Sequence, residues 1–182
     1  FPIMYTLFSF SPISCIIFVT LPSRSSGFAE GFFSYAPTFF DSAAFIPYGC
    51  MVDEFQHIVY ENPDMTPAER HAAWLKLEHE YRPHMDYGDD RFFGKGGFWQ
   101  KQTHIYDVPL YYIDYCLAQT CALQYKVKMD EDFKGAWESY LKLCKLSASD
   151  FYTNMIKEVG LDCPFEPGCM KNIVEKLEKY VK

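Results

Sequence analysis

The residues best suited to chemistry lie between Gly96 and Tyr115. The glycine pair Gly96-Gly97 is followed by a single histidine, His104, and then by closely spaced tyrosines. Neutral imidazole and phenol groups both donate hydrogen bonds, and such donors can stabilise the negatively charged oxygen of a tetrahedral intermediate. The stretch therefore predicts a site that grips a carbonyl oxygen or an oxyanion.

Tyr112 and Tyr115 share one face if a helix begins at Leu110, because residues three apart are neighbours on a helix. An unperturbed phenol, with a pKa of about 10, keeps its proton at neutral pH. The pair fits either an oxyanion-binding role or an aromatic stripe packed in a core. His104 likewise fits a structural or a catalytic role. Closure of the preceding loop would bring the three side chains together.

The composition excludes some classes of partner. The chain has 182 residues, a formal net charge of -7 and a pI of about 5.2. Nucleic-acid binders usually carry a basic patch, so we expect short peptides or small molecules as partners and no nucleic acid. The seven cysteines include no Cys-x-x-Cys pair, and we interpret them as reduced, buried, intracellular thiols.

Residues 1–36 differ in composition from the rest of the chain and show neither helical nor strand periodicity. The apolar run 3–21 approaches the length of a membrane span, but Pro12 interrupts it and no basic residue precedes it. We therefore expect no membrane association, although a membrane-tethered protein remains an alternative. Residues 1–36 are predicted to be an irregular or mis-joined lead-in, and 37–182 a separate helical region.

The folded part is predicted to be all-α, because every strong periodic signal is helical. A capping box, Thr66-Pro67-Ala68-Glu69, marks one helix start, and Arg82-Pro83 marks the end of that helix. Ser149 is expected to cap a later helix that ends at Gly160. The predicted helices are 45–60 after a break at Pro47, 67–81, a long one beyond Pro109, 132–145, one after Ser149, and 170–181, with a loop over 86–97.

Two pairs with metal-ligand character are rejected as zinc sites. His79 and His84 flank a Glu-containing segment, but they are five residues apart and Pro83 lies between them, so they diverge on a helix. Asp53 and His57 share a face at i, i+4 spacing, which we interpret as an ion pair or a capping role because a third ligand is missing.

Several motifs in order closely resemble the C-terminal part of oligoendopeptidase F-like zinc metallopeptidases, relatives of thimet oligopeptidase. The resemblance runs from about Thr38 to the end of the chain. The motifs are Phe45-Ile46-Pro47-Tyr48, the run from Val52 to Pro63, Gly96-Gly97-Phe98-Trp99-Gln100, and the run from His104 to Tyr115.

The resemblance implies an all-helical, clam-shaped peptidase that cleaves short peptides in a deep channel, with residues 37–182 as the helical C-terminal part of its catalytic domain. It also implies that a histidine and tyrosines of this region bind the substrate carbonyl and the oxyanion. Carried over by motif, the catalytic residues are His104, Tyr112 and Tyr115. The substrate-binding residues are Gly96, Gly97 and Tyr111, and Tyr111 is an alternative to Tyr112 in the catalytic role.

The family also implies a zinc ion held by a His-Glu-x-x-His motif and a further glutamate, but the chain lacks that motif. Residues 1–36 contain no histidine and one glutamate, Glu30. We therefore expect the C-terminal fragment of a cytoplasmic zinc oligopeptidase, with zinc held outside this chain, and no activity from the chain alone. The alternative is a non-enzymatic helical module that binds peptides or partners.

Overall fold

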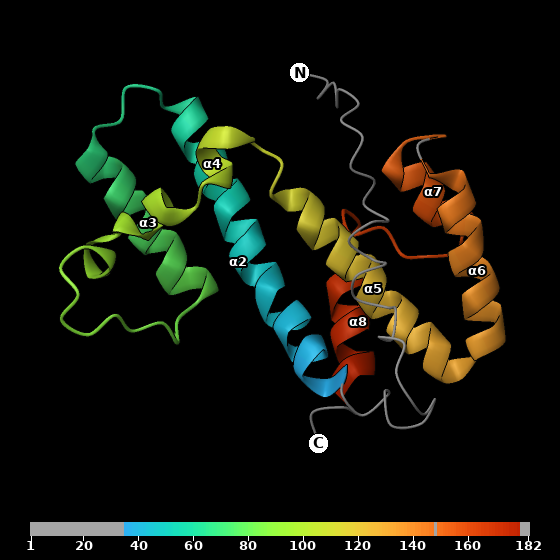
Figure 1. Cartoon of the computed structure of the whole chain (residues 1–182). Helices are drawn as coiled ribbons and strands as arrows, with labels where there is room; N and C mark the ends of the chain where they lie inside the picture. The colour runs from blue at the N-terminus through green and yellow to red at the C-terminus, as the bar shows by residue number, and fades with distance from the viewer. Residues whose placement is uncertain (1–34, 148, 179–182) are drawn as a thin grey trace. The chain divides into compact units, whose positions relative to one another are not determined.

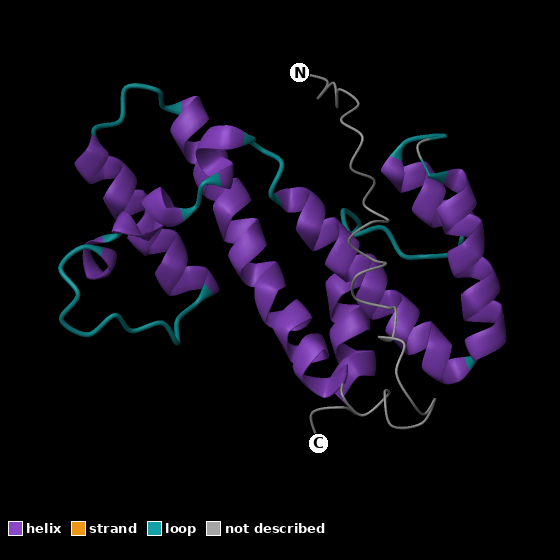
Figure 2. Ribbon diagram, viewed as in Figure 1, coloured by secondary structure: helices purple, strands orange, loops and turns teal. Residues whose placement is uncertain are grey.

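A computed structural model describes the backbone of residues 35–147 and 149–178, and side chains from residue 44 onward. Every regular element in these residues is helical and none is a strand, which confirms the all-α prediction (Figure 1, Figure 2). Most of the predicted 1–36 lead-in lies outside the described residues. The elements are α2 (Tyr35–Glu61), α3 (Pro67–Tyr81), η1 (Phe93–Lys95), η2 (Gly97–Lys101), α4 (His104–Asp107), α5 (Ile113–Glu131), α6 (Phe133–Leu146), α7 (Tyr152–Glu158) and α8 (Cys169–Leu177).

The described residues divide into two compact units, with the boundary inside α5 between Leu117 and Ala118. The first unit holds α2, α3, α4 and the 3₁₀ turns η1 and η2. Its core gathers side chains from α2, α3, η2 and the approach to α5. These buried residues are Met51, Val52, Phe55, Trp74, Leu77, Trp99 and Tyr112.

Helix α2 runs through Pro47, so the predicted break there was wrong. A proline inside a helix has no N–H to donate and crowds the carbonyl four residues earlier, at a cost of about 3 kcal/mol. The side chains that follow offset this cost, since Met51, Val52 and Phe55 are at most 1% exposed. Burying each of them contributes about 1.5–3 kcal/mol. Tertiary burial therefore outweighs the local preference of the proline.

Helix α3 begins and ends where the sequence predicts. The Thr66 side chain accepts a hydrogen bond from the Glu69 N–H, and the Glu69 carboxylate accepts one from the Thr66 N–H at 2.7 Å. This reciprocal pair satisfies two of the backbone donors that a helix start leaves without partners. At the other end, the Arg82 N–H closes the last turn on the Glu78 carbonyl.

The predicted loop 86–97 contains one 3₁₀ turn, η1, and its last residue begins a second, η2. Gly96 separates the two turns with a φ of 84°, a conformation that residues with a Cβ rarely adopt. A Cβ at Gly96 would lie 2.1 Å from the His71 carbonyl oxygen on α3. The glycine therefore lets η2 pack closely on α3.

The second unit contains the part of α5 from Ala118 onward, with α6, α7 and α8. Asp132 caps α6 by accepting a hydrogen bond from the Gly135 N–H, and α7 ends just before Gly160, which has a φ of 71°. Ser149 does not cap α7 as predicted. Its hydroxyl donates to the Leu146 carbonyl at 2.6 Å and so finishes α6, while Asp150 accepts the Phe151 N–H.

The cysteines in the described residues are free thiols, and Cys116, Cys121 and Cys169 are buried. Cys50, Cys144 and Cys163 are only half-buried, so the prediction of burial was wrong for these three. No helix in the described part of the chain combines the length and the apolar character that crossing a bilayer requires.

Candidate functional site

Helix α5 begins at Ile113, three residues later than the spacing of the tyrosines suggests. Leu110 has a φ of 60°, which is incompatible with a right-handed helix. Its N–H donates to the buried Gln56 side chain at 2.8 Å, and that bond holds the bend. Tyr112 therefore lies immediately before the helix, so the predicted helix start at Leu110 was wrong. The Tyr115 N–H still bonds the Tyr112 carbonyl at 3.3 Å, which keeps the two residues i, i+3 neighbours as predicted.

His104, Tyr112 and Tyr115 nevertheless pack together. The His104 ring lies edge to face with both tyrosines, with centroids 5.0 Å from Tyr112 and 5.8 Å from Tyr115. The two tyrosine rings are 5.4 Å apart. The short helix α4 supplies the histidine, the residue immediately before α5 is Tyr112, and the first turn of α5 supplies Tyr115. The structure thus brings together the three side chains that the sequence singled out as catalytic.

The two tyrosines differ in burial. Tyr112 is 8% exposed and belongs to the core cluster, whereas Tyr115 is half-buried at its edge. Burial raises the pKa of Tyr112 to about 12, so its hydroxyl stays neutral at physiological pH. Tyr111 lies 5.4 Å from Tyr115 and is also half-buried. Tyr115 and Tyr111 are therefore more open to a ligand than Tyr112.

Gly96 and Gly97, predicted to contact substrate, are buried against protein atoms. A Cβ at Gly97 would lie 2.8 Å from the Phe92 carbonyl oxygen, much as one at Gly96 would meet the His71 carbonyl. Both glycines allow close packing of backbone on backbone. Their effect on the site is to place η2, which leads directly to α4 and His104.

Two polar residues that the sequence analysis did not single out contact the site. The Gln102 amide Nε2 lies 2.7 Å from His104 Nδ1, and the Tyr48 hydroxyl donates to Gln102 Oε1 at 2.7 Å. Tyr48 lies on α2, 54 residues before Gln102. No local pattern connects residues so far apart, although Gln102 follows the Gly-Gly-Phe-Trp-Gln motif closely.

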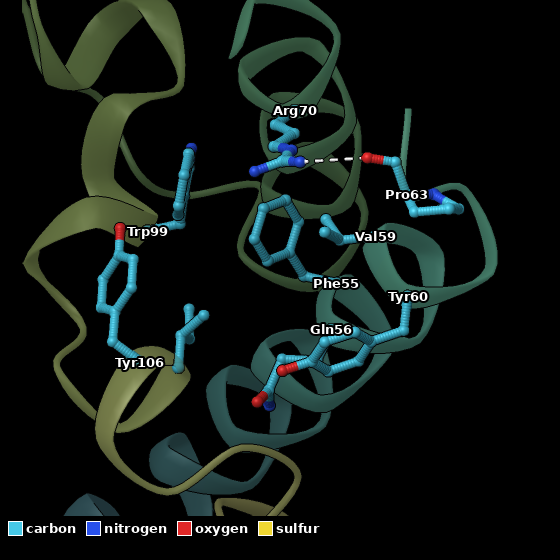
Figure 3. Close-up of a pocket in the computed structure, with 9 residues that line it drawn as sticks. Phe55, Gln56, Val59, Tyr60, Pro63, Arg70, Trp99 and Tyr106 are labelled. Carbon is cyan, nitrogen blue, oxygen red and sulfur yellow. Dashed lines mark hydrogen bonds between the residues drawn. The ribbon is translucent and has the colours of Figure 1, made fainter. Parts of the chain in front are cut away.

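A pocket of about 300 Å³ opens in the same unit, between side chains of α2 and those of η2 and α4 (Figure 3). The Arg70 guanidinium at its edge donates to the Pro63 carbonyl at 3.4 Å. His104 does not line the pocket, but the next two residues of α4 do. The volume lies at the lower end of the range for small-molecule sites. The lining residues are Phe55, Gln56, Val59, Tyr60, Pro63, Arg70, Trp99, Ile105 and Tyr106.

The described residues do not form a metal site. No group of three or more His, Cys, Asp or Glu side chains within them is placed to hold a metal ion. Asp53 and His57 form the predicted ion pair at 3.4 Å. A catalytic zinc ion normally has three protein ligands, so the described residues do not fit one.

Comparisons with known proteins give a match among solved structures. No protein-family model matches the chain, and no curated protein matches it. An X-ray structure of an oligoendopeptidase F is 45% identical, with a TM-score of 0.78 over 84% of this chain and 27% of that one. PZ peptidase A with an inhibitor is also 45% identical, with a TM-score of 0.77 over 84% of this chain and 27% of that one.

An oligoendopeptidase F from Bacillus anthracis str. Ames is 34% identical, with a TM-score of 0.65 over 83% of this chain and 24% of that one. The chain thus spans about a quarter of the length of each of these proteins. High identity together with a shared fold confirms the family that the motifs predicted. The chain is related in sequence and in fold to a part of the oligoendopeptidase F-like peptidases.

Proposed function

We propose that this chain is part of a peptidase that hydrolyses short peptides, and that its contribution is to hold the substrate carbonyl. One observation carries the proposal. The His104 ring packs within 6 Å of Tyr112 and Tyr115, in a chain that is 45% identical to part of a peptidase. Imidazole and phenol donors aimed at one oxygen stabilise the charge that develops on it during peptide hydrolysis.

The three residues have different parts in this proposal. His104 and Tyr115 donate to the carbonyl oxygen as it gains charge, because both are half-buried and so accessible to a ligand. Tyr112 supports both rings from the core side and keeps a neutral hydroxyl beside them. Tyr111 extends the substrate-facing surface. Gly96 and Gly97 act through the shape of the loop that leads to His104.

Zinc remains the proposed cofactor of the complete peptidase, held by residues other than those described. The described residues do not fit a zinc site, so their role in binding the carbonyl does not pass through the metal. A cytoplasmic location also remains a proposal. We expect the 182-residue chain alone not to cleave peptides. Zinc-dependent, chelator-sensitive cleavage of a quenched fluorescent peptide by the purified chain would contradict that expectation.

A chimera tests the function. Residues 35–178 replace the matching part of an oligoendopeptidase F that is active on a quenched peptide. We expect the chimera to cleave it, and His104→Ala and Tyr115→Phe to lower kcat by about 10²-fold each, with unchanged zinc content. His84→Ala, at an exposed histidine, is the matched control.

Equal activity of the chimera and its His104→Ala variant would refute the catalytic role. An inactive, folded chimera whose transplanted segment still binds the peptide would favour a non-enzymatic peptide-binding module.

A further inference from the structure

The hydrogen bonds behind His104 bear on which of its ring nitrogens carries the proton. A neutral imidazole has one N–H donor and one acceptor nitrogen, and the partner of one nitrogen decides the state of the other. Gln102 Nε2 lies 2.7 Å from His104 Nδ1. An amide nitrogen has only hydrogens to offer, so Nδ1 must accept and the proton must reside on Nε2.

This assignment depends on which way the Gln102 amide faces, and Tyr48 decides that. The Tyr48 hydroxyl donates to Gln102 Oε1 at 2.7 Å, which turns the amide nitrogen toward His104. Rotating the amide by 180° would place its nitrogen opposite the hydroxyl and leave the phenol hydrogen without an acceptor. Among the described residues, Tyr48 has no other hydrogen-bond partner for that hydroxyl. A half-buried donor without an acceptor is unfavourable.

The surroundings keep Tyr48 in place and protonated. Its ring packs edge to face against Trp74, Phe98 and Tyr112, and the Arg82 guanidinium lies 5.0 Å from its centroid. Burial, the largest cause, raises the pKa of Tyr48 well above its usual value. The hydroxyl therefore always has a hydrogen to give to Gln102.

We propose that Tyr48 and Gln102 are positioning residues that hold His104 as the Nε2–H tautomer, so that Nε2 is the donor presented to a substrate carbonyl. The carbonyl-binding role rests on the function proposed above, whereas the tautomer is a property of this chain. A histidine in the other tautomer would present a lone pair to the substrate oxygen and repel it. The hydrogen bonds from Tyr48 to Gln102 and from Gln102 to His104 thus determine whether His104 can donate a hydrogen bond to the substrate.

Long-range ¹H–¹⁵N correlation spectra of the 182-residue chain show which tautomer a histidine adopts. They are recorded at a pH above the usual titration range of histidine, where the imidazole is neutral. A His104→Gln variant identifies the His104 signals among those of the five histidines. We expect a protonated Nε2 and an unprotonated Nδ1, in roughly tenfold excess over the other tautomer, as one net hydrogen bond would give. Gln102→Leu should remove most of that excess, and Gln102→Glu should invert it, because a carboxylate accepts from Nδ1–H.

Tyr48→Phe keeps the ring packing and removes only the hydroxyl, so it should reduce the excess less than Gln102→Leu. Tyr81→Phe is the matched control, since that hydroxyl bonds the Glu54 carboxylate instead, and it should leave the His104 signals unchanged. A wild-type chain with the proton on Nδ1, or a folded Gln102→Leu variant with the wild-type tautomer ratio, would overturn the proposal. Neither result depends on peptide hydrolysis. The tautomer proposal can therefore fail while the proposed function holds, and the proposed function can fail while the tautomer proposal holds.

Discussion

The buried carboxylate of Glu78 accepts a hydrogen bond of 2.6 Å from the Tyr87 hydroxyl. This contact ties the last turn of α3 to the loop that leads to η1. The same carboxylate oxygen lies 3.4 Å from the Arg82 guanidinium. Burial and this carboxylate together raise the pKa of the Tyr87 hydroxyl, which therefore remains a donor. The loop that leads toward His104 is anchored to α3 partly through this pair.

Tyr87→Phe should lower the free energy of unfolding by about 1.5–3 kcal/mol, because it leaves one oxygen of a buried carboxylate with only a long contact to Arg82. Urea denaturation measures the change. Tyr106→Phe removes a hydroxyl from a tyrosine that is 54% exposed, and it should stay within about 0.5 kcal/mol of the wild type. Equal losses of unfolding free energy in the two variants would show that the hydrogen bond from Tyr87 to Glu78 does not stabilise the fold.

Gly96→Ala should destabilise the chain more than Gly88→Ala does. Both glycines have positive φ values, 84° and 52°, so either alanine carries backbone strain of about 1–2 kcal/mol. Only the Cβ at position 96 meets backbone, at 2.1 Å from the His71 carbonyl oxygen, whereas a Cβ at position 88 has nothing within 4 Å. Overpacking adds about 1–3 kcal/mol. Thermal unfolding of both variants measures the difference, and equal losses would contradict the close approach.

The sequence predicted most helix boundaries, and the failures have identifiable causes. The capping box at Thr66 and the stop at Arg82 are local signals, and the structure follows them. The break at Pro47 and the helix start at Leu110 failed because distant contacts prevail there. Burial of the residues after Pro47 holds α2 together, and the Gln56 side chain bends the chain at Leu110.

In the candidate site, too, local sequence signals were predictive and distant contacts were not. Motif order was enough to single out His104, Tyr112 and Tyr115, which the structure places in contact. Spacing gave no indication of the Tyr48–Gln102 contact, because the two residues are 54 positions apart and neither belongs to a recognisable pair. The difference in burial between Tyr112 and Tyr115 also depends on tertiary packing alone.

The capping box should make stability fall in acid. Hydrogen bonds from the Thr66 N–H and hydroxyl lower the pKa of the exposed Glu69 carboxyl. A carboxyl whose pKa is lower in the folded state stabilises the fold above its unfolded pKa of about 4.3 and loses that contribution as pH falls through the folded value. Glu69→Gln should therefore be less stable than the wild type at neutral pH, with the gap closing in acid. Glu80→Gln, at an exposed glutamate on the same helix, should show no such gap.

Asp114 in the first turn of α5 should have the opposite dependence. Burial, and then the nearby Asp53 carboxylate, raise the pKa of Asp114 above its usual value, and burial also raises that of Asp53. Because its pKa is raised in the folded state, Asp114 binds its proton more tightly in the native protein than in the unfolded chain. Its contribution to stability is therefore full below the unfolded pKa of about 3.9, and it is lost as pH rises through the folded-state pKa.

Asp114→Asn removes the ionisation, so the variant should gain free energy of unfolding relative to the wild type at neutral pH and lose that advantage below about pH 4. Asp53→Asn should gain less free energy of unfolding, because it also gives up the contact of the Asp53 carboxylate with the His57 Nε2 at 3.4 Å. Urea midpoints across the acid range measure both variants, and Asp107→Asn, at an exposed aspartate on α4, serves as the control. An Asp114→Asn advantage that stays constant with pH would mean that packing, and not the buried charge, separates the two side chains.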